Sequence, residues 1–115
     1  MARAVAFVPD LLFGSNVIGA LKAGGHDPLL ITDPAQFDGA LAGADVLIVD
    51  LTTDAQDRIE LARPALKRQS PKTLAFFSHV EGDVRDAAQQ AGFDLVVPRS
   101  RMARAAAALV SEIAG

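Results

Sequence analysis

The chain contains no cysteine, no tryptophan and no tyrosine, and its only aromatic side chains are six phenylalanines. Without cysteine it can form neither a disulfide framework nor a thiolate metal site. No apolar run approaches the length that a membrane span requires. The first expected strand begins within a few residues of the N-terminus, which leaves no room for a signal peptide. These absences predict a soluble, cytoplasmic protein that does not act at a membrane.

Positive charge is also scarce, because 11 lysines and arginines face 14 aspartates and glutamates, giving a formal net charge of -3. No basic cluster occupies one face, so we expect no nucleic-acid partner. Half of the residues are hydrophobic (50%), which is enough for a full core and argues against disorder. The length of 115 residues predicts a single domain over residues 1–115.

Short apolar segments alternate with longer helical ones along the whole chain. Strands are expected at 4–8, 28–32, 46–49, 73–77 and 95–97, and helices at 13–23, 35–42, 55–69, 82–91 and 102–113. This alternation implies right-handed crossovers and a parallel sheet. We therefore predict a flavodoxin-like, doubly wound α/β fold with five parallel strands in the order 2-1-3-4-5 and helices on both faces.

Several residues mark where these helices begin, end or bend. Gly24 and Gly92 follow the first and fourth helices, as glycine commonly does past a helix end. Ser100 is expected to cap the fifth helix. Pro64 is expected to bend or split the third, because an interior proline removes a backbone hydrogen bond. His26 follows a pair of glycines in a turn, so we expect it on the surface.

Two aspartates end expected strands and are the main indication of function. Asp50 follows the apolar run 46–49, and Asp10 follows the first strand. Open α/β sheets bind ligands at the carboxyl edge of their strands, where both aspartates should meet. Two carboxylates there could hold Mg²⁺, and Asp50 could accept a phosphoryl group. Arg99, at the end of the fifth strand, could instead pair with Asp50.

Each of these polar residues also has a plainer interpretation. Either aspartate can simply cap the helix that follows it. His79 has no second ligand at metal spacing and is expected to be a loop side chain. Arg99, Arg101 and Arg104 form either a phosphate site or a solvated helix start. The 14–19 segment has the glycine spacing of a P-loop but lacks the lysine that such a loop requires.

Several segments, in order, resemble the receiver domains of bacterial two-component response regulators, the CheY-like family. The 45–51 segment resembles the third strand and phosphoacceptor aspartate of receivers. Segments 74–79 and 87–94 resemble their fourth strand, fourth helix and the turn that follows. The 97–100 segment falls on the end of the fifth strand, where receivers carry a lysine. The resemblance covers essentially the whole chain and implies the same fold.

The resemblance also implies roles for the residues at the sheet edge. Asp50 matches the phosphoacceptor, and Asp10 matches one of the acids that bind Mg²⁺, so both are candidate Mg²⁺ ligands. Arg99 stands at the position of the family lysine. Phe77 falls on the Thr/Ser switch position in the ungapped alignment, whereas a slip of one residue would make Ser78 the switch hydroxyl.

Departures from the family pattern point to a degenerate receiver, or pseudo-receiver. Pro9 stands where receivers have a second acid, and Phe77 cannot hydrogen-bond a phosphoryl oxygen. We therefore predict a two-component signalling and protein-interaction module that is phosphorylation-independent or atypical, with Arg99 paired to Asp50 or Asp10. Two alternatives stay open: a phosphorylatable single-domain response regulator that uses Mg²⁺, and a small-molecule or nucleotide-binding α/β domain. A catalytic enzyme has the least support.

The resemblance implies another signalling protein as partner, either a kinase or an output protein, and a homodimer is a further candidate. The sequence itself offers one contact site, the apolar run 11–13 directly after Asp10. In a loop this run would form an exposed apolar patch. At the start of the first helix it would be buried.

Overall fold

The computed structural model describes residues 1–78 and 80–114 of the chain. His79 lies outside the described residues, so its loop position stays a prediction. The strands are β1 (Arg3–Phe7), β2 (Asp27–Ile31), β3 (Val46–Asp50), β4 (Lys72–Phe77) and β5 (Leu95–Pro98). The helices are α1 (Leu11–Ala23), the short 3-10 helix η1 (Pro34–Gln36), α2 (Phe37–Leu41), α3 (Ala55–Arg68), α4 (Gly82–Ala91) and α5 (Arg99–Ala114).

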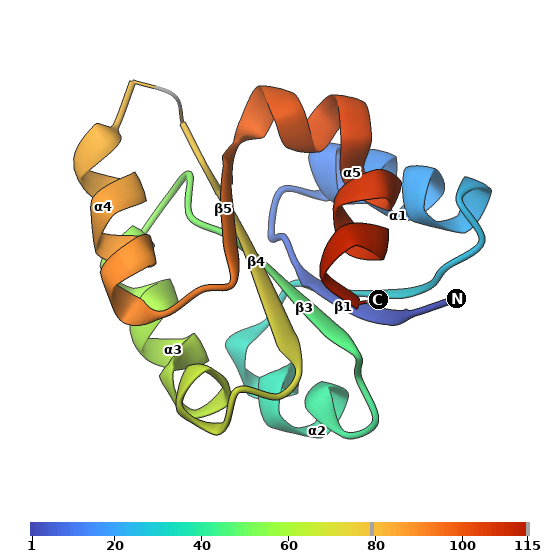
Figure 1. Cartoon of the computed structure of the whole chain (residues 1–115), viewed down its shortest axis with the longest axis horizontal. Coiled ribbons are helices and arrows are strands. Elements are labelled where there is room, and N and C mark those ends of the chain that lie inside the picture. The colour runs from blue at the N-terminus through green and yellow to red at the C-terminus, as the bar shows by residue number, and fades with distance from the viewer. Residues whose placement is uncertain (79, 115) are drawn as a thin grey trace.

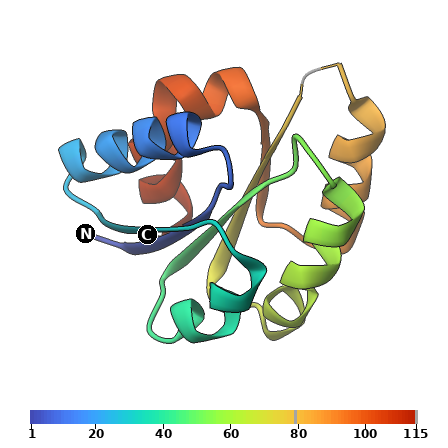
Figure 2. The same ribbon diagram turned by 180° about the vertical axis from the view of Figure 1, so that it is seen from behind.

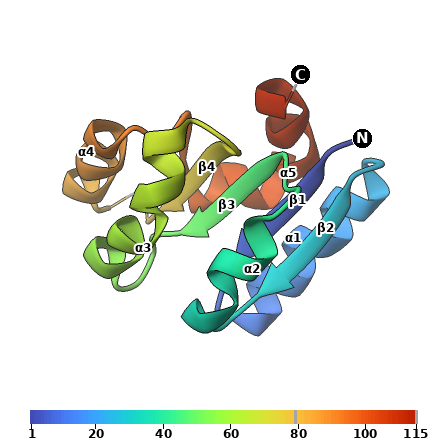
Figure 3. The same cartoon turned by 90° about the horizontal axis from the view of Figure 1, so that it is seen from below.

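The five strands form one parallel sheet in the order β2-β1-β3-β4-β5, which confirms the predicted fold and strand order. Helices α1 and α5 cover one face, and α2, α3 and α4 cover the other (Figure 1 and, from behind, Figure 2). Figure 3 shows the two helical layers on either side of the twisted sheet. The sheet therefore separates two hydrophobic cores.

Strand β3 lies at the centre of this arrangement and is buried over its whole length. Its side chains alternate between the two cores, because successive residues of a strand point to opposite faces. Ile48 packs in the core under α1 and α5, whereas Leu47 and Val49 pack in the core under α2, α3 and α4. A strand buried on both faces requires a continuous apolar run, and this run ends at Asp50.

Helices α1 and α5 pack very closely where α1 ends. A Cβ atom placed on Gly24 would lie only 2.4 Å from the Cβ of Ala107. At the other end of α1, Phe13 lies beneath the Arg99 guanidinium. The two helices therefore run side by side in the same direction from the carboxyl edge of the sheet.

Two expectations about helices differ from the structure. Helix α5 begins at Arg99, so Ser100 is its second residue and does not cap it. Further along, the helix is kinked at Ala105, whose backbone angles are not helical (φ -138°, ψ 26°). Helix α3 runs through Pro64 as one helix, so it is not split there, and a bend at Pro64 stays a prediction. Buried contacts of Ile59 and Leu66 on either side of Pro64 hold the helix against the sheet.

In the described part of the chain, no helix is long and apolar enough to span a membrane.

His26 is half-buried at the surface and has hydrogen-bond partners at both ring nitrogens, contacts that its expected turn position did not predict. Its Nδ1 accepts a hydrogen bond from the backbone N–H of Ala2 at 3.1 Å. Its Nε2 lies 3.0 Å from the hydroxyl of Ser111 and 3.2 Å from the carbonyl oxygen of Ala107. The imidazole therefore ties the first strand to the last helix, at the end of the molecule opposite the aspartates.

Candidate functional site at the carboxyl edge of the sheet

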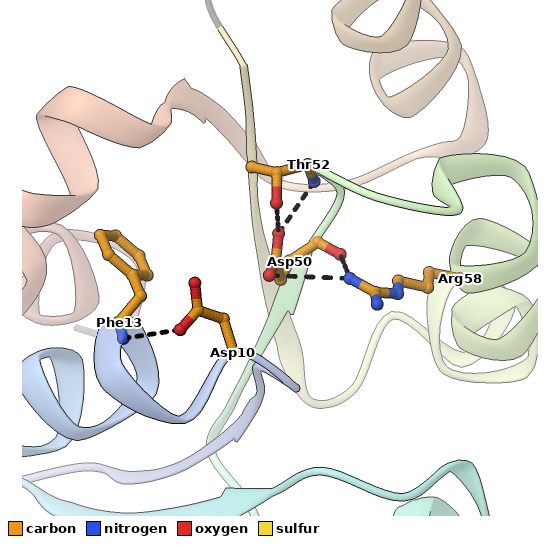
Figure 4. A network of polar contacts seen from close by, with 5 residues as sticks. All are labelled: Asp10, Phe13, Asp50, Thr52 and Arg58. Carbon is orange, nitrogen blue, oxygen red and sulfur yellow. Dashed lines mark hydrogen bonds and ion pairs between the residues drawn. The ribbon is translucent and has the colours of Figure 1, made fainter.

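The strand register brings the two predicted acids to the same edge. Strands β1 and β3 are neighbours, with Phe7 level with Val49, so Asp50 ends its strand beside the point where β1 ends. Asp10 follows three residues after Phe7, at the start of α1. Figure 4 shows both carboxylates at this edge. The sheet topology therefore places Asp10 and Asp50 at the same edge, as the sequence predicts.

Asp50 is buried, with only 3% of the residue exposed. Its Oδ1 accepts two hydrogen bonds from Thr52, one from the backbone N–H at 2.8 Å and one from the hydroxyl at 2.5 Å. The intervening Leu51 extends the pairing of β3, because its N–H donates to the carbonyl of Phe76 at 2.8 Å. The loop after β3 therefore fixes the Asp50 carboxylate in one orientation (Figure 4).

Arg58, from the first turns of α3, supplies the positive charge next to Asp50. Its Nη1 lies 3.6 Å from Asp50 Oδ2 and donates a 2.9 Å hydrogen bond to the Asp50 carbonyl oxygen. The guanidinium carbon lies 5.5 Å from the centre of the Phe7 ring. Only 13% of the Arg58 side chain and 5% of the Asp50 side chain are exposed. The result is a largely buried ion pair supported by an aromatic ring.

Arg58 is not among the site residues predicted from the sequence, although its spacing in the helix is a signal for it. Ala62 and Ala65 follow Arg58 at helical spacings of four and seven residues, and both are buried against the sheet. Arg58 therefore occupies a position on the buried face of α3. A charge on the core-facing side of a helix that follows a strand-ending aspartate is a reason to expect an ion pair between them.

Asp10 is exposed and caps α1. Its Oδ1 accepts a hydrogen bond from the backbone N–H of Phe13 at 3.1 Å, which is the usual geometry of an aspartate N-cap. Asp50 has no such role, because the N-cap residue of α3 is Asp54. The cap interpretation therefore holds for Asp10 and not for Asp50.

The architecture is shared with many solved structures, although no protein-family model and no curated protein matches the sequence. A response regulator from Thermotoga maritima superposes with a TM-score of 0.83 at 14% identity, over 99% of this chain and 98% of that one. The signal receiver domain of the response regulator NarL from Mycobacterium tuberculosis gives 0.80 at 20% identity, over 98% and 95% of the two chains. The BeF3-activated N-terminal receiver domain of Klebsiella pneumoniae RstA gives 0.82 at 14% identity, over 97% of each chain.

The chain has the receiver-domain fold. The match extends over almost the full length of the chain and of these three structures. Sequence identity is 20% or less in each of the three, so the likeness concerns the arrangement of the backbone. What the edge of this receiver fold can do chemically depends on its own side chains.

In this receiver fold Arg99 does not form the predicted ion pair with Asp50 or Asp10. Its guanidinium carbon instead lies 4.0 Å from the centre of the Phe13 ring, and no ion pair of Arg99 occurs within the described residues. Because α5 begins at Arg99 itself, the side chain projects toward α1, where the aromatic face offers a cation–π contact. The cation beside Asp50 comes from α3 instead.

The two candidates for the switch position lie next to each other at the end of β4. Phe77 is the last residue of the strand and is only 5% exposed, whereas Ser78 follows the strand and is half-buried. Asp50 is level with Phe76 in the neighbouring strand. The roles of Phe77 and Ser78 stay predictions.

The residues at this edge do not fit the Mg²⁺ site that the receiver fold implies. Among the described residues, no three His, Asp or Glu side chains gather where they could hold a metal ion. Asp50 Oδ1 already accepts two hydrogen bonds, and Asp10 is engaged with the N-terminus of α1. Mg²⁺ prefers carboxylate oxygens that are free to coordinate it, and here a guanidinium already adjoins Asp50.

The structure also tests whether this edge of the sheet could bind a nucleotide. The 14–19 segment, which has glycines at P-loop spacing, lies inside helix α1 and so cannot wrap around a phosphate. A hollow of about 450 Å³ does open beside Arg58, between Pro34 and Leu61. Its rim includes the carboxylates of Asp54 and Asp57, which would repel a nucleotide's phosphates. This edge is poorly suited to binding a nucleotide.

Proposed function

We propose that this protein is a receiver-type signalling module that acts by binding another protein and does not cycle a phosphoryl group. The observation that carries the proposal is the state of the Asp50 carboxylate. The residue is 3% exposed, and its Oδ1 accepts both the N–H and the hydroxyl of Thr52. Arg58 adjoins the other oxygen.

Phosphorylation of an aspartate requires more than a carboxylate at the right place. The attacking oxygen must reach the phosphorus atom, and positioned cations must neutralise the charge on the transferred group. One carboxylate oxygen of Asp50 already accepts two hydrogen bonds from Thr52. The carboxylates that the structure describes at this edge do not fit Mg²⁺. Phe77, in the ungapped switch position, offers no hydroxyl to a phosphoryl oxygen.

The proposed partner surface is the start of α1. Leu11 and Leu12 lie in the first turn of the helix, yet they are 66% and 77% exposed, so both sequence-based alternatives for them were incomplete. Phe13, the third residue of the run, is buried beneath Arg99. The two exposed leucines form an apolar contact surface, which we propose binds another signalling protein, either a kinase or an output protein.

The test is phosphorylation by a small-molecule donor. The protein is incubated with Mg²⁺ and acetyl phosphate and then examined by intact-mass spectrometry, beside a receiver domain known to become phosphorylated. We expect no phosphoryl adduct on this chain under conditions that modify the reference. An adduct that disappears in Asp50→Asn would contradict the proposal and establish the alternative, a phosphorylatable response regulator.

A further inference from the structure

The hollow beside Arg58 is built from three segments that lie far apart in the sequence. They are the end of β1, the turn that follows β2, and the first turns of α3. Its volume of about 450 Å³ falls in the range of small-molecule sites, about 300–1,000 Å³. The function proposed above makes no use of this hollow, so its lining can be examined for a ligand of its own.

Half of the lining is apolar and is contributed by Phe7, Pro9, Pro34 and Leu61. The turn that carries Pro34 is fixed by one side chain, because Gln36 Oε1 accepts the backbone N–H groups of Thr32 and Asp33, both at 3.2 Å. A ligand that enters the hollow therefore does not have to order this turn, which lowers the cost of binding.

The charges of the lining leave an excess of negative charge. Asp54 and Asp57 are both exposed, and neither forms an ion pair in the part of the chain that the structure describes. Arg58, which also borders the hollow, is already paired with Asp50. Two carboxylates without a cationic partner thus adjoin an apolar surface.

The formation of α3 accounts for one of these two carboxylates and not for the other. Asp57 lies in the first turn of the helix, where a negative charge is favourable. Asp54 stands at the N-cap position, yet its side chain makes no capping hydrogen bond. Its backbone is in the left-handed region (φ 49°), which glycine adopts at no steric cost. Helix α3 therefore does not require a carboxylate at position 54.

We propose that this hollow binds a small organic cation, namely an amine or guanidine that carries an apolar body. The charged group pairs with Asp54 and Asp57, and the apolar body covers Pro34 and Leu61. An anion is repelled by the two carboxylates, and an inorganic cation gains nothing from the apolar wall. The inference goes beyond the proposed function, because it adds a small-molecule ligand to a module that we propose acts by binding a protein.

The test is an amide NMR titration of the wild-type protein with benzylamine, a cation with an aromatic body at neutral pH. No metal ion or phosphate compound is present. We expect saturable shifts at Thr32, Asp54 and Asp57 at millimolar benzylamine, the affinity expected of so small a ligand. Benzyl alcohol has nearly the same shape without the charge and should bind about tenfold more weakly. Benzoate should cause no saturable shift at these residues.

Matched variants test the two parts of the site separately. Asp54→Asn combined with Asp57→Asn keeps the side-chain shapes, and asparagine tolerates the backbone conformation of residue 54. This double variant should bind benzylamine about tenfold more weakly and benzyl alcohol as before. Asp83→Asn is the control, because Asp83 is an exposed acid in the first turn of α4 and does not line the hollow. Leu61→Ala should weaken the binding of both compounds.

Either of two results would overturn the inference. One is a wild-type protein that shows no saturable shifts at Thr32, Asp54 and Asp57 with benzylamine, or that binds benzyl alcohol equally well. The other is a folded double variant that binds benzylamine as the wild type does. If the double variant does not fold, the comparison of the three compounds on the wild type decides. Neither result bears on phosphorylation of Asp50, because no phosphoryl donor is present.

Discussion

At the scale of single residues, Asp50 and Arg58 depend on each other. Removing either side chain would leave the other as an unpaired charge in a largely buried position. Asp50→Ala should lower the free energy of unfolding by roughly 3 kcal/mol, as expected when one partner of a buried pair is removed. Arg58→Met should act in the same direction. Urea denaturation followed by circular dichroism measures both, since the chain has no tryptophan or tyrosine.

The double variant tests whether the two residues are coupled. Asp50→Ala with Arg58→Met removes both charges, so its loss of stability should fall short of the sum of the single losses by about 1–3 kcal/mol. The exposed pair of Glu60 and Arg63 is the control, because surface pairs contribute little. Strict additivity at Asp50 and Arg58 would show that they do not interact.

Thr52 provides a second prediction at this scale. Thr52→Val keeps the shape of the side chain and removes the hydroxyl that donates to Asp50 Oδ1. We expect a loss of roughly 1.5–3 kcal/mol in unfolding free energy, the range for a hydrogen bond to a charged group. Thr52→Ser keeps the hydroxyl and should lose much less. Equal stability of the two variants would count against this hydrogen bond.

At the scale of elements, the contact between α1 and α5 depends on the absence of a side chain at Gly24. Its added Cβ would lie 2.4 Å from the Ala107 Cβ, so Gly24→Ala must push the helices apart. We expect a loss of about 1–3 kcal/mol, as for overpacking.

Two further variants control for this effect. Gly19→Ala lies in the same helix with nothing within 4 Å of the new Cβ, and it should stabilise the protein by about 0.5–1 kcal/mol. Ala107→Gly should recover much of the loss in Gly24→Ala when the two are combined. A neutral Gly24→Ala would refute the close approach of α1 and α5.

Helix α3 carries a pH-dependent pair on its outer face. The hydrogen bond from Arg63 lowers the pKa of Glu60, and the pair lies at the surface, with 38% of the Arg63 side chain and 56% of the Glu60 side chain exposed. Because the folded-state pKa is depressed, any contribution of the pair to stability is present above the unfolded-state pKa and fades as the pH falls through the folded-state value. In Arg63→Gln, NMR titration of the Glu60 carboxyl should give a higher pKa than in the wild type. An unchanged pKa would show that the pair does not form in solution.

The sequence was sufficient to locate the elements and insufficient to locate their long-range contacts. Each strand lies within one residue of its expected range, because a buried strand needs an apolar run and polar residues end it. The start of α5 was missed, since Ser100 is a good cap by type, but the helix already begins at Arg99.

The site shows the same division between local and long-range information. The edge position of Asp10 and Asp50 follows from alternating strands and helices, so the sequence contains it. The ion-pair partner of Asp50 depends on how the loop 51–54 leads the chain into α3. Two arginines, Arg58 and Arg99, were candidates for this ion pair. Arg99 also ends a strand at this edge, yet its guanidinium lies over the Phe13 ring at the start of α1. Only the packed structure distinguishes Arg99 from Arg58.

At the scale of the whole molecule, the chain combines a receiver fold with an edge whose buried carboxylate, Asp50, is already paired with Arg58. The fold extends over almost the full length of two of the solved structures it matches, so the backbone provides a sheet edge like theirs. The acid at the end of β3 is enclosed by Thr52 and Arg58. If the proposed function holds, binding of a partner should depend on exposed surfaces such as Leu11 and Leu12.

The most direct test of this account is an amide NMR titration of the wild-type protein with Mg²⁺, followed by Mg²⁺ with beryllofluoride, a phosphoryl mimic. The account predicts a folded spectrum with no saturable shifts around Asp10, Asp50 and Arg99 at millimolar metal. Saturable shifts at these residues that are lost in Asp50→Ala would contradict it. They would show a working phosphoacceptor and support the alternative of a phosphorylatable response regulator.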